Sequence, residues 1–168
     1  MPKIKNSYIS KKITLEMNLV RTKSLIYEKD QADYLNWFPM VLSLQVEDEI
    51  YTFEYLPTIS LEGMKYLFSI VDNMIVERRK LSSIKNYRSS VFRWGATEGE
   101  FSFVFENIIE EFVSIELWLN IASMKKEYAG YNIGFDFSVI SEEFIEFIAQ
   151  LKNQLYELTD GHEGERLV

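Results

Sequence analysis

Alternation of apolar and polar residues along most of the chain is the feature that most constrains its fold. Alternation with a period of two places every second side chain on the same face of a β-strand. In the clearest stretch, Val113, Ile115, Leu117 and Leu119 share one face, and Trp118 lies on the other. The pattern predicts about seven strands, near residues 13–19, 38–46, 51–55, 91–94, 101–105, 112–121 and 131–137.

Short turns connect several of these strands. The polar triplet Glu47-Asp48-Glu49 separates two alternating runs, which is typical of a β-hairpin. Pro57 is expected to end the strand that follows, because proline cannot donate a hydrogen bond to a neighbouring strand. Strands joined so closely should form a largely antiparallel sheet. A further tight reversal and a loop are expected at residues 107–110 and 123–130.

Two segments change to the helical spacing of apolar residues. Ser60 can cap the first helix, which should fade near Glu77, and Ser141 can cap the second. The order βββα-ββββα predicts a single α+β domain over the whole chain, with a mostly antiparallel sheet of about seven strands and two amphipathic helices on one face of that sheet. Residues 1–11 and 159–168 are expected to be loose termini.

The net charge of −8 is distributed unevenly along the chain. Residues 1–29 and 77–93 each carry a local charge of +5, whereas residues 30–59 and 94–124 each contain six acids and no base. Binding to a nucleic-acid backbone depends on Lys and Arg, so this composition argues against it. An acidic surface favours encounter with a basic protein. The alternative is that the acids only keep the protein in solution.

The side chains that usually carry catalysis or bind metals are almost missing. The chain has no cysteine, and its one histidine, His162, falls in an expected loose terminus and is interpreted as inert. No nucleotide-binding or nucleophile motif occurs, and one histidine without cysteine excludes the common zinc sites. We therefore expect no enzymatic activity, no cofactor and no metal.

Carboxylate pairs are the remaining candidates for acid–base chemistry. The acidic triplet of the first hairpin lacks the spacing of a calcium loop and is interpreted as a solvated tip. Glu110 and Glu111 are interpreted in the same way. Glu98 and Glu100 flank a glycine and could lie together, but no sugar-binding groove is indicated. These pairs therefore give no specific signal for a reaction.

Two groups of aromatic residues have different interpretations. Phe101, Phe103 and Phe105 alternate along one strand among acids, which favours a place in the core over a platform for stacking nucleic-acid bases. Trp118 and Phe112 lie opposite the apolar stripe of their own strand. They either form an exposed apolar surface, which often marks an interface, or are covered by a second layer.

The expected compartment is the cytoplasm. The basic N-terminus is not followed by an unbroken apolar run, and no segment approaches the roughly 18 apolar residues that span a bilayer. The absence of cysteine suits a reducing environment. We therefore expect no signal peptide and no association with a membrane.

Four features together resemble those of a known family. They are a tryptophan that opens the second strand (Trp37-Phe38), a hairpin that leads to a proline-ended strand and helix (51–76), paired long strands (101–121), and the segment FDFSVISEEFIEFIAQLKNQL at 135–155. The arrangement resembles the small immunity proteins of polymorphic toxin systems, in particular the WapI type. The resemblance covers nearly the whole chain, and it implies a non-enzymatic protein that binds and neutralises a cognate toxin domain inside the producing cell. The expected toxin is basic, for example a nuclease, because an acidic inhibitor can imitate the charge of its substrate.

The residues expected to bind the partner come from charge and exposure, because the family offers no motif that transfers position by position. Charge reversal at two of them, Glu110 and Glu111, is expected to disrupt binding. The open alternatives are a structural or regulatory interaction module of unknown partner, which could form a homodimer through an exposed sheet or edge strand, and a carboxylate enzyme. The expected partner-binding residues are Glu47, Asp48, Glu49, Glu98, Glu100, Glu110, Glu111 and Trp118.

Overall fold

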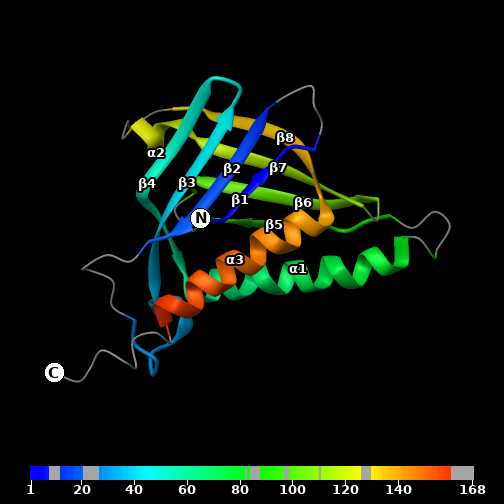
Figure 1. Cartoon of the computed structure of the whole chain (residues 1–168). Coiled ribbons are helices and arrows are strands. Elements are labelled where there is room, and N and C mark those ends of the chain that lie inside the picture. Colours follow the sequence, from blue (N-terminus) through cyan, green and yellow to red (C-terminus); the bar gives the residue numbers. More distant parts are fainter. Residues whose placement is uncertain are drawn as a thin grey trace.

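The chain forms two four-stranded antiparallel sheets and two long helices in the computed structural model shown in Figure 1. The structure describes residues 1–7, 12–20, 27–81, 83, 88–96, 99–109, 111–125 and 130–159. Within each sheet, strands that follow one another in sequence pair side by side. The first sheet contains β1 (Lys3–Lys5), β2 (Ile13–Leu19), β3 (Trp37–Val46) and β4 (Glu49–Ser60), and the second contains β5 (Val91–Gly95), β6 (Phe101–Ile109), β7 (Phe112–Asn120) and β8 (Asn132–Ile140).

The α+β class and the antiparallel pairing are confirmed, but the prediction of a single seven-stranded sheet is wrong. β4 and β5 do not pair, because the long helix α1 (Leu61–Leu81) separates them and each half of the chain completes its own meander. Alternation determines which side chains share a face of a strand, but it carries no information about which strands share a sheet.

Three short elements were not predicted, and one of them is the 3₁₀ helix η1 (Asp33–Leu35) between β2 and β3. Lys3–Lys5, which the sequence placed in a loose terminus, form β1, with Ile4 opposite Leu15 of β2. Ile121–Lys125 form the short helix α2 inside the predicted loop. Over the described residues the order is therefore ββββα-βββαβα and not βββα-ββββα. Elements of three to five residues are too short for periodicity to reveal.

The turns agree with the sequence only in part. The β3–β4 hairpin is confirmed, with its turn at residues 47–48 and a left-handed φ of 52° at Glu47. β4 does not end at Pro57, because it is an edge strand whose outer side needs no hydrogen-bond partner. β6 does not end at Asn107, where the reversal at residues 107–110 was expected to begin. It continues to Ile109 after a shift of register that follows Asn107.

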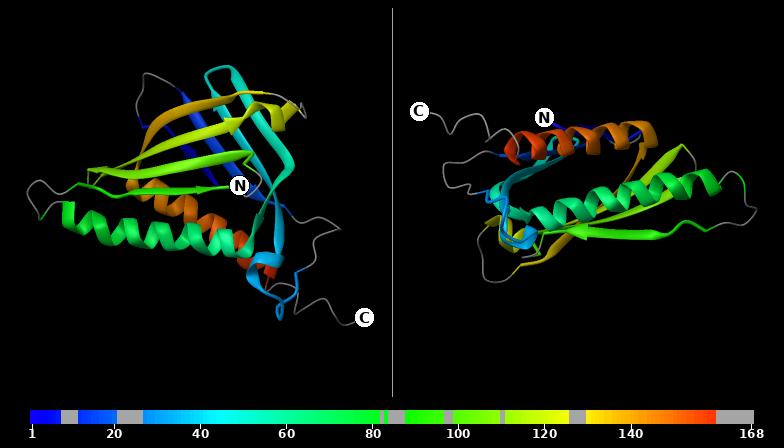
Figure 2. Two further views of the ribbon diagram at one scale, coloured as in Figure 1. Left: turned by 180° about the vertical axis from the view of Figure 1, so that it is seen from behind. Right: turned by 90° about the horizontal axis from the view of Figure 1, so that it is seen from below.

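The two long helices, α1 and α3 (Ser141–Thr159), lie side by side, and both sheets lie on the same side of this pair (Figures 1 and 2). Ser60 caps α1 as predicted, because its hydroxyl accepts a hydrogen bond of 3.1 Å from the Gly63 N–H. α1 continues past Glu77, where the sequence placed its end. The helices pack against both sheets, α1 against β4, β5 and β6 and α3 against β1, β2, β7 and β8, so their placement on one face of one sheet is corrected.

A single hydrophobic core joins the inner faces of both sheets to the apolar stripes of the helices. Phe101, Phe103 and Phe105 belong to it, which confirms the interpretation of these residues as core. Trp94 of β5 packs on Phe101 and Phe103 with ring centroids 5.5 and 5.6 Å apart, and its indole N–H donates to the Gly63 carbonyl at 2.9 Å. No helix within the described ranges is long and apolar enough to cross a membrane.

Candidate protein-binding surface

The outer face of the second sheet carries acidic side chains on three neighbouring strands. The register places Val104, Glu116 and Asp136 side by side across β6, β7 and β8, and Arg93 continues this row on β5. Glu106 lies on the same face, one step along β6. Trp118 also lies on this face. We use the name acidic face for the surface formed by Glu106, Glu116, Asp136 and Trp118. Arg93 is its one neighbouring base among the described strand residues, so its local field is negative.

Trp118 is the largest exposed apolar side chain among the described residues of this face, with 42% of its surface exposed. Its ring lies over Gly134 of β8, where an added Cβ would come within 2.9 Å of the indole. Its indole N–H donates a hydrogen bond to the Glu116 carboxylate. Of the two interpretations that the sequence left open, the exposed one is therefore correct for Trp118, while Phe112 at the other end of β7 is half-buried.

A shallow groove of about 600 Å³ runs beside Trp118. It begins on the outer face at Trp118 and Glu116, crosses β6 and β5, and reaches the exposed ring of Tyr66 on α1. Gly95 lines the groove where β5 and β6 approach closely, because a Cβ there would meet the Phe101 carbonyl at 2.5 Å. The groove has an exposed aromatic ring at each end, and both Glu116 and Arg93 line it. Exposed aromatic rings beside charged groups are typical of protein-binding surfaces.

The acidic triplet of the β3–β4 hairpin belongs to the other sheet. Glu47 is held in place, because its carboxylate accepts the Lys12 N–H at 2.9 Å. Glu49 accepts the Tyr51 hydroxyl at 2.6 Å, and this hydrogen bond raises the pKa of Tyr51. Glu47, Asp48 and Glu49 are exposed, as predicted for a hairpin tip. The structure does not bring them into the acidic face, because they stand at the end of the first sheet.

The other predicted residues are spread along the second sheet. Glu98 and Glu110 lie outside the described residues, as does His162. Glu100 lies near the Trp118 end of β7, where its carbonyl accepts the Asn120 N–H at 2.8 Å, and its half-buried carboxylate has one oxygen without a hydrogen bond among the described residues. Glu111 is exposed at the opposite end of β7. The structure therefore places Glu100 near Trp118 and separates Glu111 from both.

A buried carboxylate that the sequence analysis missed connects α1 to the second sheet. Glu77 is 5% exposed and accepts hydrogen bonds from the Ser90 N–H (2.8 Å), the Ser89 hydroxyl (2.8 Å) and the Asn107 amide (3.0 Å). Burial by itself would raise the pKa of Glu77, but these hydrogen bonds outweigh it and hold the pKa below its ordinary value. The signal was present, because Glu77 follows Ile70 and Met74 on the buried stripe of α1.

The described residues hold no cluster of three or more His, Asp or Glu side chains that could bind a metal ion. Glu77 is already saturated with hydrogen-bond donors, so its geometry suits a structural role better than proton transfer. No protein-family model, no curated protein and no solved structure matches the chain. The candidate site is thus defined by its surface chemistry alone, and that chemistry is suited to binding.

Proposed function

We propose that the protein is a non-enzymatic immunity protein that binds and neutralises a cognate basic toxin domain, such as a nuclease, through the acidic face of its second sheet. The observation that carries the proposal is the exposed Trp118, seated on Gly134 and flanked by Glu116 and Asp136. Exposed aromatic residues at the centre of a patch supply much of the binding energy of protein interfaces.

The charge of this face supports a basic partner. Carboxylates on neighbouring strands produce a field that attracts Lys and Arg and speeds encounter between the two proteins. A nuclease binds a phosphate backbone with a basic surface, so a protein that presents carboxylates to that surface competes with the substrate. Neutralisation then requires shape and charge but no reactive side chain, which agrees with the resemblance to WapI-type immunity proteins.

The experiment is co-expression with the toxin domain encoded beside this gene, together with calorimetry of the purified pair. The proposal expects protection of the cell and a stoichiometric complex with a dissociation constant that rises with salt. A neighbouring gene without a toxin, together with no protection in co-expression, would overturn it. Sedimentation of the protein alone separates the proposal from a module that only forms homodimers, because a neutraliser binds its toxin whether or not it self-associates.

A further inference from the structure

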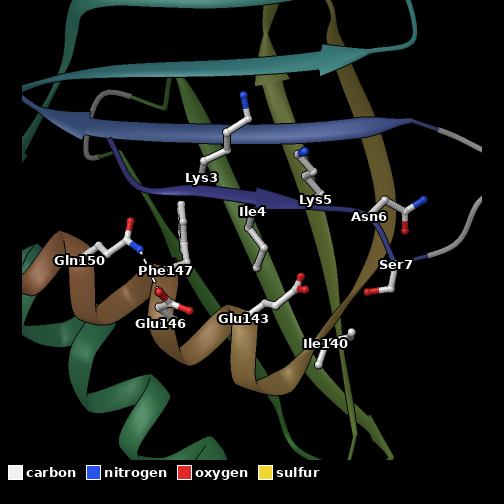
Figure 3. Close-up of a pocket in the computed structure, with 10 residues that line it drawn as sticks. All are labelled: Lys3, Ile4, Lys5, Asn6, Ser7, Ile140, Glu143, Glu146, Phe147 and Gln150. Carbon is white, nitrogen blue, oxygen red and sulfur yellow. Dashed lines mark hydrogen bonds between the residues drawn. The ribbon is translucent and has the colours of Figure 1, made fainter.

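A second groove, of about 520 Å³, lies between β1 and the first turns of α3, on the opposite sheet from Trp118 (Figure 3). β1 forms one wall of the groove, and Glu143 and Glu146 of α3 stand along the other. Ile4 and Phe147 between the walls are 2% and 3% exposed, so the apolar floor is closed. A ligand of this groove would therefore be held mainly by backbone and charged groups.

The backbone of β1 presents hydrogen-bonding groups to this groove that no other described strand uses. The Asn6 N–H donates to the Ile13 carbonyl at 2.9 Å, and the Pro2 carbonyl accepts the Met17 N–H at 3.2 Å, so these even-numbered residues face β2. Peptide groups alternate in direction along an antiparallel strand, and those of Lys3 and Lys5 consequently point to the open edge. No described residue pairs with this edge at Lys3 or Lys5, and the edge closes at Ser7, whose N–H donates to the Ser138 carbonyl of β8 at 2.8 Å.

The charged side chains near this edge are separated by sign, with the lysines on one side of β1 and the glutamates on the side of α3. Lys3 and Lys5 point away from α3 (Figure 3). Lys3 forms an ion pair with Glu16 of β2. Glu143 and Glu146 are exposed and make no ion pair with any described residue. Ser7 Oγ at the closed end is buried and has no hydrogen-bond partner in the described part of the chain.

We propose that this groove binds an extended peptide segment with Lys or Arg at alternate positions, added as a strand to the open edge of β1. The peptide backbone pairs with Lys3 and Lys5, and its basic side chains face Glu143 and Glu146. A second copy of this chain is a poorer occupant, because antiparallel pairing of two β1 strands about Ile4 sets Lys3 opposite Lys5. The site is independent of the proposed function, because it shares no residue with the acidic face.

The test uses the peptide acetyl-Thr-Arg-Thr-Arg-Thr-Arg-Thr-amide, added to the ¹⁵N-labelled full chain. The expected result is saturable shifts of the Lys3 and Lys5 amide signals and slower hydrogen exchange at both. A control peptide of equal charge, in which the two inner threonines are prolines, cannot pair with the strand and should bind at least tenfold more weakly. Equal binding of the two peptides, or no shift at millimolar peptide, would overturn the proposal.

Two matched double variants test whether the carboxylates of Glu143 and Glu146 contribute to peptide binding. The double substitution Glu143→Gln and Glu146→Gln should weaken the peptide by about five- to tenfold, as expected for two exposed ion pairs. Glu62→Gln with Glu157→Gln removes two exposed carboxylates outside the groove and should change the affinity less than twofold. Equal losses of peptide affinity in the two double variants would count against a basic peptide as the occupant. A dimer of the protein in sedimentation that dissociates when the peptide is added would also count against it. Trp118→Ala should leave peptide affinity unchanged, which separates this site from the toxin-binding proposal.

Discussion

The two sheets have the same construction, four consecutive strands followed by a long helix, but their outer faces differ. On the first sheet, polar groups satisfy one another, since Lys3 pairs with Glu16 and the Ser43 and Thr52 hydroxyls bond across β3 and β4 at 3.1 Å. On the second sheet, neighbouring carboxylates face a single base and surround the exposed Trp118. The two sheets thus have the same inner arrangement and different outer faces. The exposed Trp118 and the carboxylates near it are not needed for folding, so they mark the surface where a function is expected.

The strongest test of this difference between the two outer faces is to reverse the charge on one face at a time. Glu106→Lys with Glu116→Lys should weaken binding of the cognate toxin domain about 100-fold, because each change replaces an attraction with a repulsion. Glu49→Lys with Glu54→Lys on β4 makes the same change in net charge on the first sheet and should cost less than threefold. Calorimetry of the wild type and the two double variants with the toxin domain measures both effects. The reverse ranking would move the interface to the hairpin tip.

The tryptophans of the two outer faces provide a sharper test. Trp118→Ala should cost about 2 kcal/mol of binding free energy, roughly 30-fold, as expected for an aromatic anchor at the centre of an interface. Trp37→Ala, on the half-buried outer side of β3, should leave toxin affinity within threefold. Both variants are checked for an intact fold by circular dichroism before their dissociation constants are compared. Equal losses would mean that Trp118 has no special role.

The buried carboxylate of Glu77 joins α1 to the second sheet, and the first sheet offers a weaker polar contact for comparison. Glu77→Gln should lower the free energy of unfolding by about 1–2 kcal/mol, because an NH₂ group would then face donors from Ser89, Ser90 or Asn107. The matched change Thr52→Val removes the half-buried hydrogen bond between the Ser43 and Thr52 hydroxyls of the first sheet and should cost about 0.5 kcal/mol. Urea unfolding at neutral pH measures both.

The same variant has a defined pH dependence. The pKa of Glu77 is lower in the folded than in the unfolded state, so its stabilisation is fully present above the unfolded value of about 4.3 and is lost as the pH falls through the folded value. The stability difference between the wild type and Glu77→Gln should therefore shrink in acid below about pH 4. A difference that stays constant down to pH 2.5 would show that hydrogen bonding to the ionised form is not its cause.

The smallest effect is expected at the glycine under Trp118. Gly134→Ala forces the indole to move, since the new methyl group would lie 2.9 Å from its ring. Its effect on the free energy of unfolding should stay below about 1 kcal/mol, because alanine reduces the entropy of the unfolded strand. The measurement is tryptophan emission, which should shift to longer wavelength, with the same substitution in a Trp118→Phe background as the control that should not shift.

The sequence predicted which side chains of a strand share a face better than it predicted which strands belong to the same sheet. Ile115 and Leu117 are buried and Trp118 is exposed because side chains alternate along any strand, whichever sheet contains it. The division into two sheets depends on contacts between residues far apart in sequence, and the period of a pattern does not record them. Pro57 was misjudged for the same reason, because its effect depends on whether β4 lies at an edge.

The candidate surface could be predicted only as far as local chemistry allowed. The exposure of Trp118 and of Asp48 follows from strand parity and turn polarity. The seat of Trp118 on Gly134 requires the β7–β8 register, and the network around Glu77 requires α1 to meet Asn107 of β6. These contacts connect elements that sequence periodicity describes one at a time, so only the assembled structure shows them.

Pairing between consecutive strands has a consequence for synthesis on the ribosome. The first sheet and α1 lie within the first half of the chain, so their hydrogen bonds can form before the second sheet has been translated. α3 follows both sheets in the chain and packs on β1 and β2. The inner face of these two strands therefore stays uncovered by α3 on the nascent chain until the second sheet and α3 have been translated.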